Sequence, residues 1–208
     1  MHRFARVTRR RALLAGAMMI AAGAPAGAQD SPAESLAGKI DSVRGDAFAE
    51  RASVRRALRP TADVFIGDLV ETDAASALTM HLGRATIVKL GALAKFHIDR
   101  FVIDAGGMLD LDQGALVLDR NEEARKERLQ IRSPFGLIAV RGTLFFAGPS
   151  NGVFGVFVAR GAVTVTGGGR TVQLSPGEGT DVARPGAQPS APGAWAPDRV
   201  AAAFRSAG

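Results

Sequence analysis

Short runs of alternating apolar and polar residues, separated by glycines, fill the chain between residues 36 and 183. From Ile138 to Phe146 every second residue is apolar or glycine, and this period of two predicts a β-strand with one buried face. No stretch within these bounds has a convincing helical period. We therefore predict strands near residues 37–49, 62–71, 76–82, 85–90, 94–103, 107–118, 128–133, 136–147, 152–159, 162–166, 170–174 and 178–183.

Four glycines occupy similar local sequences, in which an apolar residue and one or two polar residues come first and an apolar stretch follows. They are Gly45, Gly114, Gly142 and Gly161. A glycine inside a strand marks a bulge, a bend or a close backbone approach. Around Gly114 the apolar positions also change parity, as a bulge or corner would require. The pattern predicts an all-β fold of short, glycine-cornered strands: a compact β-roll, a small β-solenoid or a sandwich.

One predicted strand is apolar at nearly every position. Between residues 153 and 158 only Gly155 interrupts the valines and phenylalanines. Such a strand is either buried on both faces or presents an apolar face to a partner.

The composition changes after Val182. Residues 184–208 are rich in proline and alanine, which predicts an extended tail, with a short helix starting near Asp198. Trp195 and Phe204 are the side chains that we expect to dock this tail on the core.

The N-terminal residues 1–28 have the pattern of an export signal peptide. Arginines at 9–11 precede a mildly apolar run at 12–24, and small residues at 26–28 form a cleavage site. The run is too short to span a bilayer, and the paired arginines are typical of the twin-arginine (Tat) route. The expected location is the periplasm, with residues 29–35 as a short leader and no stable transmembrane segment after cleavage. The alternative is an uncleaved anchor, which Pro25 and the short apolar run disfavour.

The net charge of +6 does not indicate nucleic-acid binding. Five of the 26 basic residues precede the first acidic residue, Asp30, and the rest balance the 20 acidic residues closely. They form no basic stripe and no aromatic stacking platform. The absence of cysteine excludes disulfides, thiolate metal sites and a cysteine nucleophile.

Four short motifs resemble those of the FecR domain family. The strongest runs from Ser133-Pro134-x-Gly136 to Val140-Arg141-Gly142-Thr143-x-Phe145. The others are Gly67-Asp68-x-Val70-x-Thr72, Gly161-x-Val163-x-Val165 and Leu174-x-Pro176-Gly177-Glu178. The resemblance covers roughly residues 38–183, nearly all of the predicted β domain at 36–183. Its motif residues, which we interpret as mainly structural, are Gly67, Asp68, Thr72, Pro134, Gly136, Arg141, Gly142, Thr143, Phe145, Gly161 and Gly177.

The resemblance implies a signalling role. Members of the family that inhibit sigma factors carry a cytoplasmic N-terminal segment and a membrane-spanning helix, and neither is recognisable in this sequence. The expectation is therefore a stand-alone, exported FecR-domain protein. Arg141 is either a ligand or partner contact, or one half of an ion pair or hydrogen bond beside Gly142. The structural interpretation is favoured because Arg44 and Arg160 occupy similar positions.

No catalytic, cofactor or metal site is predicted. His81 and His97 lie on outward positions without readable partners, and we expect both to be solvated. Asp104, Asp110 and Asp112 could be calcium ligands, but they lack the spacing of a calcium loop, and carboxylates on a solvated face are the default.

The favoured function is a non-catalytic periplasmic FecR-like binding or sensor module in envelope signalling or regulation, with another envelope protein as partner. The alternative is an envelope structural protein or a cell-wall glycan binder. A hydrolase that uses Asp110, Asp112 or His97 ranks last.

Overall fold

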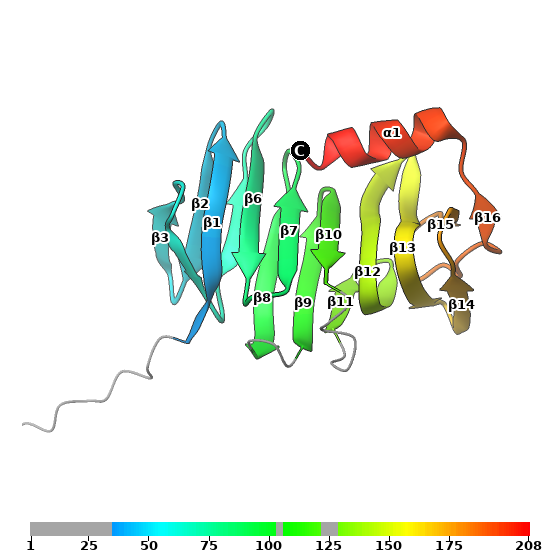
Figure 1. Cartoon of the computed structure of the whole chain (residues 1–208), viewed down its shortest axis with the longest axis horizontal. Coiled ribbons are helices and arrows are strands. Elements are labelled where there is room, and N and C mark those ends of the chain that lie inside the picture. Colours follow the sequence, from blue (N-terminus) through cyan, green and yellow to red (C-terminus); the bar gives the residue numbers. More distant parts are fainter. Residues whose placement is uncertain (1–34, 103–105, 122–128) are drawn as a thin grey trace, which may run out of the picture. The chain divides into compact units, whose positions relative to one another are not determined.

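The computed structural model describes residues 35–102, 106–121 and 129–208 (Figure 1). The predicted signal peptide, most of the leader and Asp104 lie outside these residues. The described elements are β1 (Leu36–Arg44), β2 (Ala47–Arg51), β3 (Val54–Ala57), β4 (Asp63–Phe65), β5 (Leu69–Thr72), β6 (Ala77–Leu82), β7 (Thr86–Leu90), β8 (Lys95–Val102), β9 (Gly106–Gln113), β10 (Leu116–Arg120), β11 (Leu129–Ser133), β12 (Gly136–Ser150), β13 (Val153–Gly167), β14 (Arg170–Leu174), β15 (Glu178–Val182), β16 (Gly193–Ala194) and α1 (Pro197–Ser206).

All described strands belong to one hydrogen-bonded sheet. Its main path runs β3-β2-β5-β8-β9-β11-β12-β10-β7-β6-β1-β4, and β13 branches from β12 to pair with β14 and β15. Neighbouring strands are antiparallel, except that β9 and β11 are parallel. The predicted all-β fold with a short C-terminal helix is confirmed.

The sheet folds over, so that its two halves face each other. β4 and β5 stand far apart along the hydrogen-bonded path, although only residues 66–68 connect them. The long β12 belongs to both halves: residues 136–140 pair with β11, and residues 144–147 pair with β10. β13 is shared in the same way between β14 and β15. We call the half with β1, β6, β7, β10 and β15 layer A, and the half with β2, β5, β8, β9, β11 and β14 layer B.

The four matching glycines mark the places where the chain passes between the layers. Gly45 connects β1 to β2, Gly114 connects β9 to β10, and Gly142 and Gly161 lie inside β12 and β13. Their φ angles are +74°, +87°, +60° and +82°, in the left-handed region that glycine adopts without steric cost. The corners predicted from the sequence are therefore confirmed. They let the chain pass from one layer to the other, which gives a roll of two layers.

The main hydrophobic core lies between the layers. Along β6, the buried Leu78, Met80 and Leu82 alternate with outward-facing residues, as a strand with one wet face requires. The residues facing the core come from both layers and include Val70, Phe96 and Leu109 on the side of layer B.

The apolar strand at 153–158 is buried on both faces. Phe154, Val156 and Val158 belong to the main core, whereas Phe157 belongs to a second cluster on the outside of layer A. Ala203 of α1 belongs to that second cluster, and Figure 1 shows α1 running past the upper ends of β12 and β13. The C-terminal tail therefore docks on the core through Trp195 and Phe204, as predicted, and covers the second face of β13. No helix among the described residues is long and apolar enough to cross a membrane.

Candidate functional site: an apolar groove at the motif turn

Asp68 of the Gly67-Asp68 motif is a structural anchor. Its side chain is fully buried, and Arg56 donates two hydrogen bonds to it, at 3.1 and 2.5 Å. The backbone N–H of Phe65 donates a third at 2.8 Å, and the Arg51 Nε lies 3.5 Å away. A buried carboxylate is tolerated when it is paired and hydrogen-bonded in this way. Asp68 thus ties the β4–β5 turn to the β2–β3 hairpin.

Two motif threonines are also structural. The Thr72 hydroxyl donates to the Gly91 carbonyl at 2.6 Å and accepts from the Ala94 N–H at 2.9 Å, which fixes the turn between β7 and β8. The fully buried Thr143 hydroxyl donates to the Ala162 carbonyl at 3.1 Å. It also accepts from the N–H of Arg141 at 3.2 Å, and so closes the bend of β12.

The remaining motif residues shape turns or fill the core. Phe145 is fully buried, and Gly177 forms an open turn at φ +87°. Gly136 has φ +146°, and a Cβ atom there would lie 2.4 Å from the Thr166 carbonyl oxygen. Pro134 is exposed in the β11–β12 turn.

Arg141 differs from the other polar motif residues. It is exposed, and its side chain makes no hydrogen bond or ion pair within the described part of the chain. Arg44, at a similar corner, is exposed in the same way, whereas Arg160 pairs with Asp119 at 2.5 Å. The expected structural partner of Arg141 is therefore not among the described residues.

The motif turn before β12 forms one wall of an apolar groove, which we call the Phe135 groove. Phe135 stacks on Phe154 of β13, with ring centroids 4.4 Å apart and planes 6° from parallel. The contact joins the two ends of the β12–β13 hairpin, because this hairpin folds over at Gly142 and Gly161. The turn itself is held by Ser133, whose hydroxyl accepts from the Phe135 N–H at 3.2 Å.

The Phe135 groove has a volume of about 440 Å³. This lies within the range of small-ligand sites in proteins. Apolar side chains dominate its lining, and its charged residues are Asp112 and Arg184, both exposed. Two carboxylates, or a base beside a nucleophile, do not meet here. The groove is therefore suited to binding an apolar group rather than to acid–base chemistry. Its main lining residues are Leu111, Phe135, Pro149, Val153, Phe154 and Pro185.

A second, polar groove of about 480 Å³ lies on the outside of layer A. It follows one row of the sheet in which His81, Ile87, Asp119, Leu144 and Arg160 are successive cross-strand neighbours. The charged groups of this row already have partners within the chain: Arg160 pairs with Asp119, and His81 pairs with an aspartate of β1. It is therefore the weaker candidate for a ligand site.

The structure brings His97 and Asp110 together across β8 and β9, which the sequence did not reveal. The His97 Nδ1 lies 3.5 Å from the Asp110 Oδ2, and Arg132 Nη2 lies 2.7 Å from the same oxygen. The Asp110 hydrogen bond, followed by its charge, raises the pKa of Arg132. The Asp110 carboxylate is therefore neutralised by a guanidinium. Asp112 is exposed, and among the described residues no group of three histidine or acidic side chains gathers to hold a metal.

These features define a glycine-cornered, two-layer β domain in which most of the motif residues build turns and bends. Residues 68–164 match the model of the FecR protein family, so the resemblance read from the motifs is confirmed and this stretch is a FecR-family segment. The match starts at the buried Asp68 and includes the Arg141-Gly142-Thr143 bend. No curated protein sequence matches the chain.

Two crystal structures share the fold, each of a proposed anti-sigma factor from Parabacteroides distasonis. One superposes with a TM-score of 0.54 at 17% sequence identity, over 64% of this chain and 63% of the other. The second gives 0.53 at 15% identity, over 64% and 62%. The chain thus spans somewhat less than two thirds of the length of each, and the similarity establishes the fold.

Proposed function

We propose that this chain is a non-catalytic binding module of envelope signalling that acts in the periplasm and recognises another envelope protein. The FecR-family segment and the fold shared with proposed anti-sigma factors support a regulatory role. The signal-peptide pattern of residues 1–28 supports export. Fractionation of cells that produce the chain with a C-terminal tag tests the location.

The Phe135 groove is the observation that carries the proposal. It combines the turn of the strongest family motif with an open apolar surface, and its lining contains no pair of groups for acid–base catalysis. Apolar pockets with few charged groups at the rim are typical of recognition sites. The partner inserts an apolar side chain beside Phe135 and Phe154 and orients its polar groups toward Asp112 and Arg184.

Capture from envelope extracts tests this function with a matched pair of variants. Val153→Asp places a carboxylate in the groove, whereas Val54→Asp places one on the edge strand β3, where the valine is 66% exposed. The wild-type chain and Val54→Asp should retain the same specific protein, and Val153→Asp should lose it. The retained protein is then purified, and its direct binding is measured with the same three chains.

Two results would contradict the proposal. One is equal retention by Val153→Asp and Val54→Asp. The other is a wild-type chain that retains no protein, together with a gene deletion that changes no transcript. Retention on purified peptidoglycan without any transcriptional effect would favour the alternative of a cell-wall glycan binder.

A further inference from the structure

The C-terminal residues 190–208, which we call the strap, cross the outside of layer A. The strap runs along β15 as β16, turns at Trp195 and continues as α1, which lies across β12 and ends above Gly91, the residue after β7 (Figure 1). It therefore touches several strands that come from distant parts of the sequence.

Glycines make room for the strap on three strands or their ends. A Cβ atom at Gly179 would lie 2.3 Å from the Trp195 ring, and one at Gly155 would lie 2.6 Å from it. A Cβ atom at Gly91 would lie 1.9 Å from the Ser206 carbonyl oxygen. Real Cβ atoms do not approach other atoms this closely. The absence of side chains at these three glycines thus lets the Trp195 ring and the end of α1 lie directly on the backbone of the sheet.

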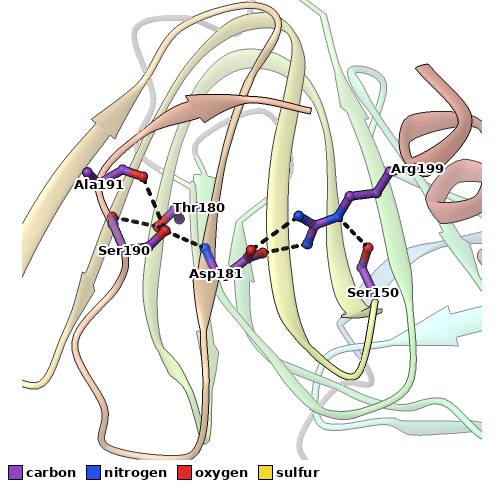
Figure 2. Close-up of polar contacts among 6 residues, drawn as sticks. All are labelled: Ser150, Thr180, Asp181, Ser190, Ala191 and Arg199. Carbon is purple, nitrogen blue, oxygen red and sulfur yellow. Dashed lines mark hydrogen bonds and ion pairs between the residues drawn. The ribbon is translucent and has the colours of Figure 1, made fainter. Parts of the chain in front are cut away.

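The first part of the strap covers the open edge of β15. Asp181 and Ser190 exchange hydrogen bonds: the Ser190 N–H donates to the Asp181 carbonyl at 2.9 Å, and the Asp181 N–H donates to the Ser190 hydroxyl at 3.0 Å. The Thr180 hydroxyl donates to the Ser190 carbonyl at 2.9 Å (Figure 2). An uncovered strand edge is a template for pairing with another chain.

Arg199 joins α1 to β15 and to the end of β12. Figure 2 shows its guanidinium between Asp181 and Ser150. It donates to the two carboxylate oxygens of Asp181 at 3.1 and 2.5 Å and to the Ser150 hydroxyl at 3.0 Å. The same guanidinium lies 3.5 Å from the centre of the Trp195 ring. Asp181 and Ser150 of the underlying surface therefore favour a bound segment that carries a guanidinium next to an aromatic ring, as Arg199 and Trp195 do in the strap.

An aromatic cluster completes the contact. Trp195 lies 5.3 Å from the ring of Phe157 and 6.3 Å from that of Phe146, and Phe204 lies 6.3 and 6.4 Å from the same two rings. These separations are typical of favourable aromatic pairs. Without the strap, Phe146 and Phe157 would form an exposed apolar patch beside the open edge of β15.

The strap has little stability of its own. α1 has ten residues, and its N-cap, Ala196, provides no side-chain hydrogen bond. Isolated helices of this length are marginal in water. Helix α1 therefore depends on its docking contacts with the sheet for its stability.

We propose that the surface under the strap is a docking site for a partner segment with the same chemistry, and that the strap occupies it until the partner arrives. The partner enters as a short extended stretch along β15 and continues as an amphipathic helix. Its arginine pairs with Asp181, and its aromatic side chains cover Phe146 and Phe157. This inference rests on the proposed binding function, but it concerns a surface separate from the Phe135 groove.

The chain contains its own reporter for the test, because Trp195 is its single tryptophan and it has no tyrosine. Gly91→Ala collides with the backbone of the strap, whereas Gly193→Ala, in the strap itself, meets nothing within 4 Å. The full-length wild type and both variants are compared by Trp195 emission. Binding of a fluorescein-labelled peptide of residues 190–208 is then followed by anisotropy, with a scrambled peptide as control.

The expected result separates the two variants. Gly91→Ala should shift the Trp195 emission to longer wavelength, keep its strand signal in circular dichroism, and bind the peptide at least about tenfold more tightly than the wild type. Gly193→Ala should behave like the wild type.

Equal emission and equal peptide affinity in all three chains would overturn the proposal, and so would a released strap without peptide binding. Dimers of Gly91→Ala that the peptide dissociates would identify the occupant as the strap of a second copy, and would overturn its assignment to a different partner. The proposed function is tested separately, because it predicts that Val153→Asp loses the envelope protein that the wild type and Val54→Asp retain.

Discussion

Gly142 and Gly161 lie against each other where β12 and β13 bend together. Both have left-handed φ angles, and a Cβ atom on Gly161 would lie 2.2 Å from the Gly142 carbonyl oxygen. The register of the two strands shifts at this place. The two bends are therefore one corner, and this corner brings Phe135 to Phe154 at the groove.

We predict that Gly161→Ala destabilises the fold by more than the roughly 1–2 kcal/mol that a left-handed φ costs a residue with a side chain. The additional loss comes from the contact with Gly142. Gly177→Ala is the control, because Gly177 has φ +87° and nothing within 4 Å of its added Cβ. Thermal melting of both variants measures the difference. Gly142→Val should also lower the melting temperature, and an unchanged value, or equal losses in the two alanine variants, would contradict the account of the corner.

The buried carboxylate of Asp68 gives a second prediction. Asp68→Ala should cost about 1–3 kcal/mol, because it leaves the Phe65 N–H and the partly exposed Arg56 guanidinium without the carboxylate that accepts their hydrogen bonds. Asp63→Ala should cost at most about 1 kcal/mol, because the Asp63 side chain is 43% exposed in its pair with Lys39. Urea unfolding followed by Trp195 fluorescence measures both. Similar losses would show that burial of Asp68 contributes little.

Local sequence was sufficient to predict most strands and the four glycine corners. It missed β3 and β16, and it divided the continuous β13 into two strands. The period of two identifies strands, and a glycine between polar and apolar residues identifies positions such as Gly114 where the chain changes layer. The docking of the tail was also predictable, since Trp195 and Phe204 are large apolar side chains in a segment rich in proline and alanine.

Contacts between distant strands were not predictable. A period of two does not say which strand lies next to which, so the parallel pairing of β9 with β11 gave no signal in the sequence. The same holds for the pairing of His97 with Asp110, and for the burial of Arg120, whose Nη1 donates to the Thr86 hydroxyl at 2.9 Å. The Phe135 groove depends on the folded hairpin and could not be located from the chain order.

Thr143 provides a third prediction, which concerns the family motif itself. Its buried hydroxyl connects the Arg141 N–H to the Ala162 carbonyl. Thr143→Val keeps the shape but removes both hydrogen bonds, and we expect a loss of about 1–3 kcal/mol. Thr164→Val is the control, because the hydroxyl of the half-buried Thr164 makes no hydrogen bond within the described residues. If Thr143→Val were as stable as Thr164→Val, the Thr143 hydroxyl would not be needed for the bend of β12.

The pH dependence of stability gives the last prediction. A hydrogen bond from Lys95, together with the charges of Lys95 and Arg55, holds the pKa of Glu71 below its ordinary value of 4.5, although burial acts in the opposite direction. A lowered folded-state pKa contributes stability above the unfolded pKa, and this contribution is lost as the pH falls through the folded value.

Glu71→Gln should therefore be less stable than the wild type by roughly 0.5–1 kcal/mol near neutral pH, and the difference should shrink as the pH is lowered through and below 4.5. Glu50→Gln is the control, since Glu50 makes no side-chain hydrogen bond or ion pair within the described residues, and its loss near neutral pH should be smaller than that of Glu71→Gln. Urea midpoints at several pH values measure both differences. A constant Glu71→Gln difference across this range would mean that the pairing of Glu71 with Lys95 and Arg55 does not stabilise the fold.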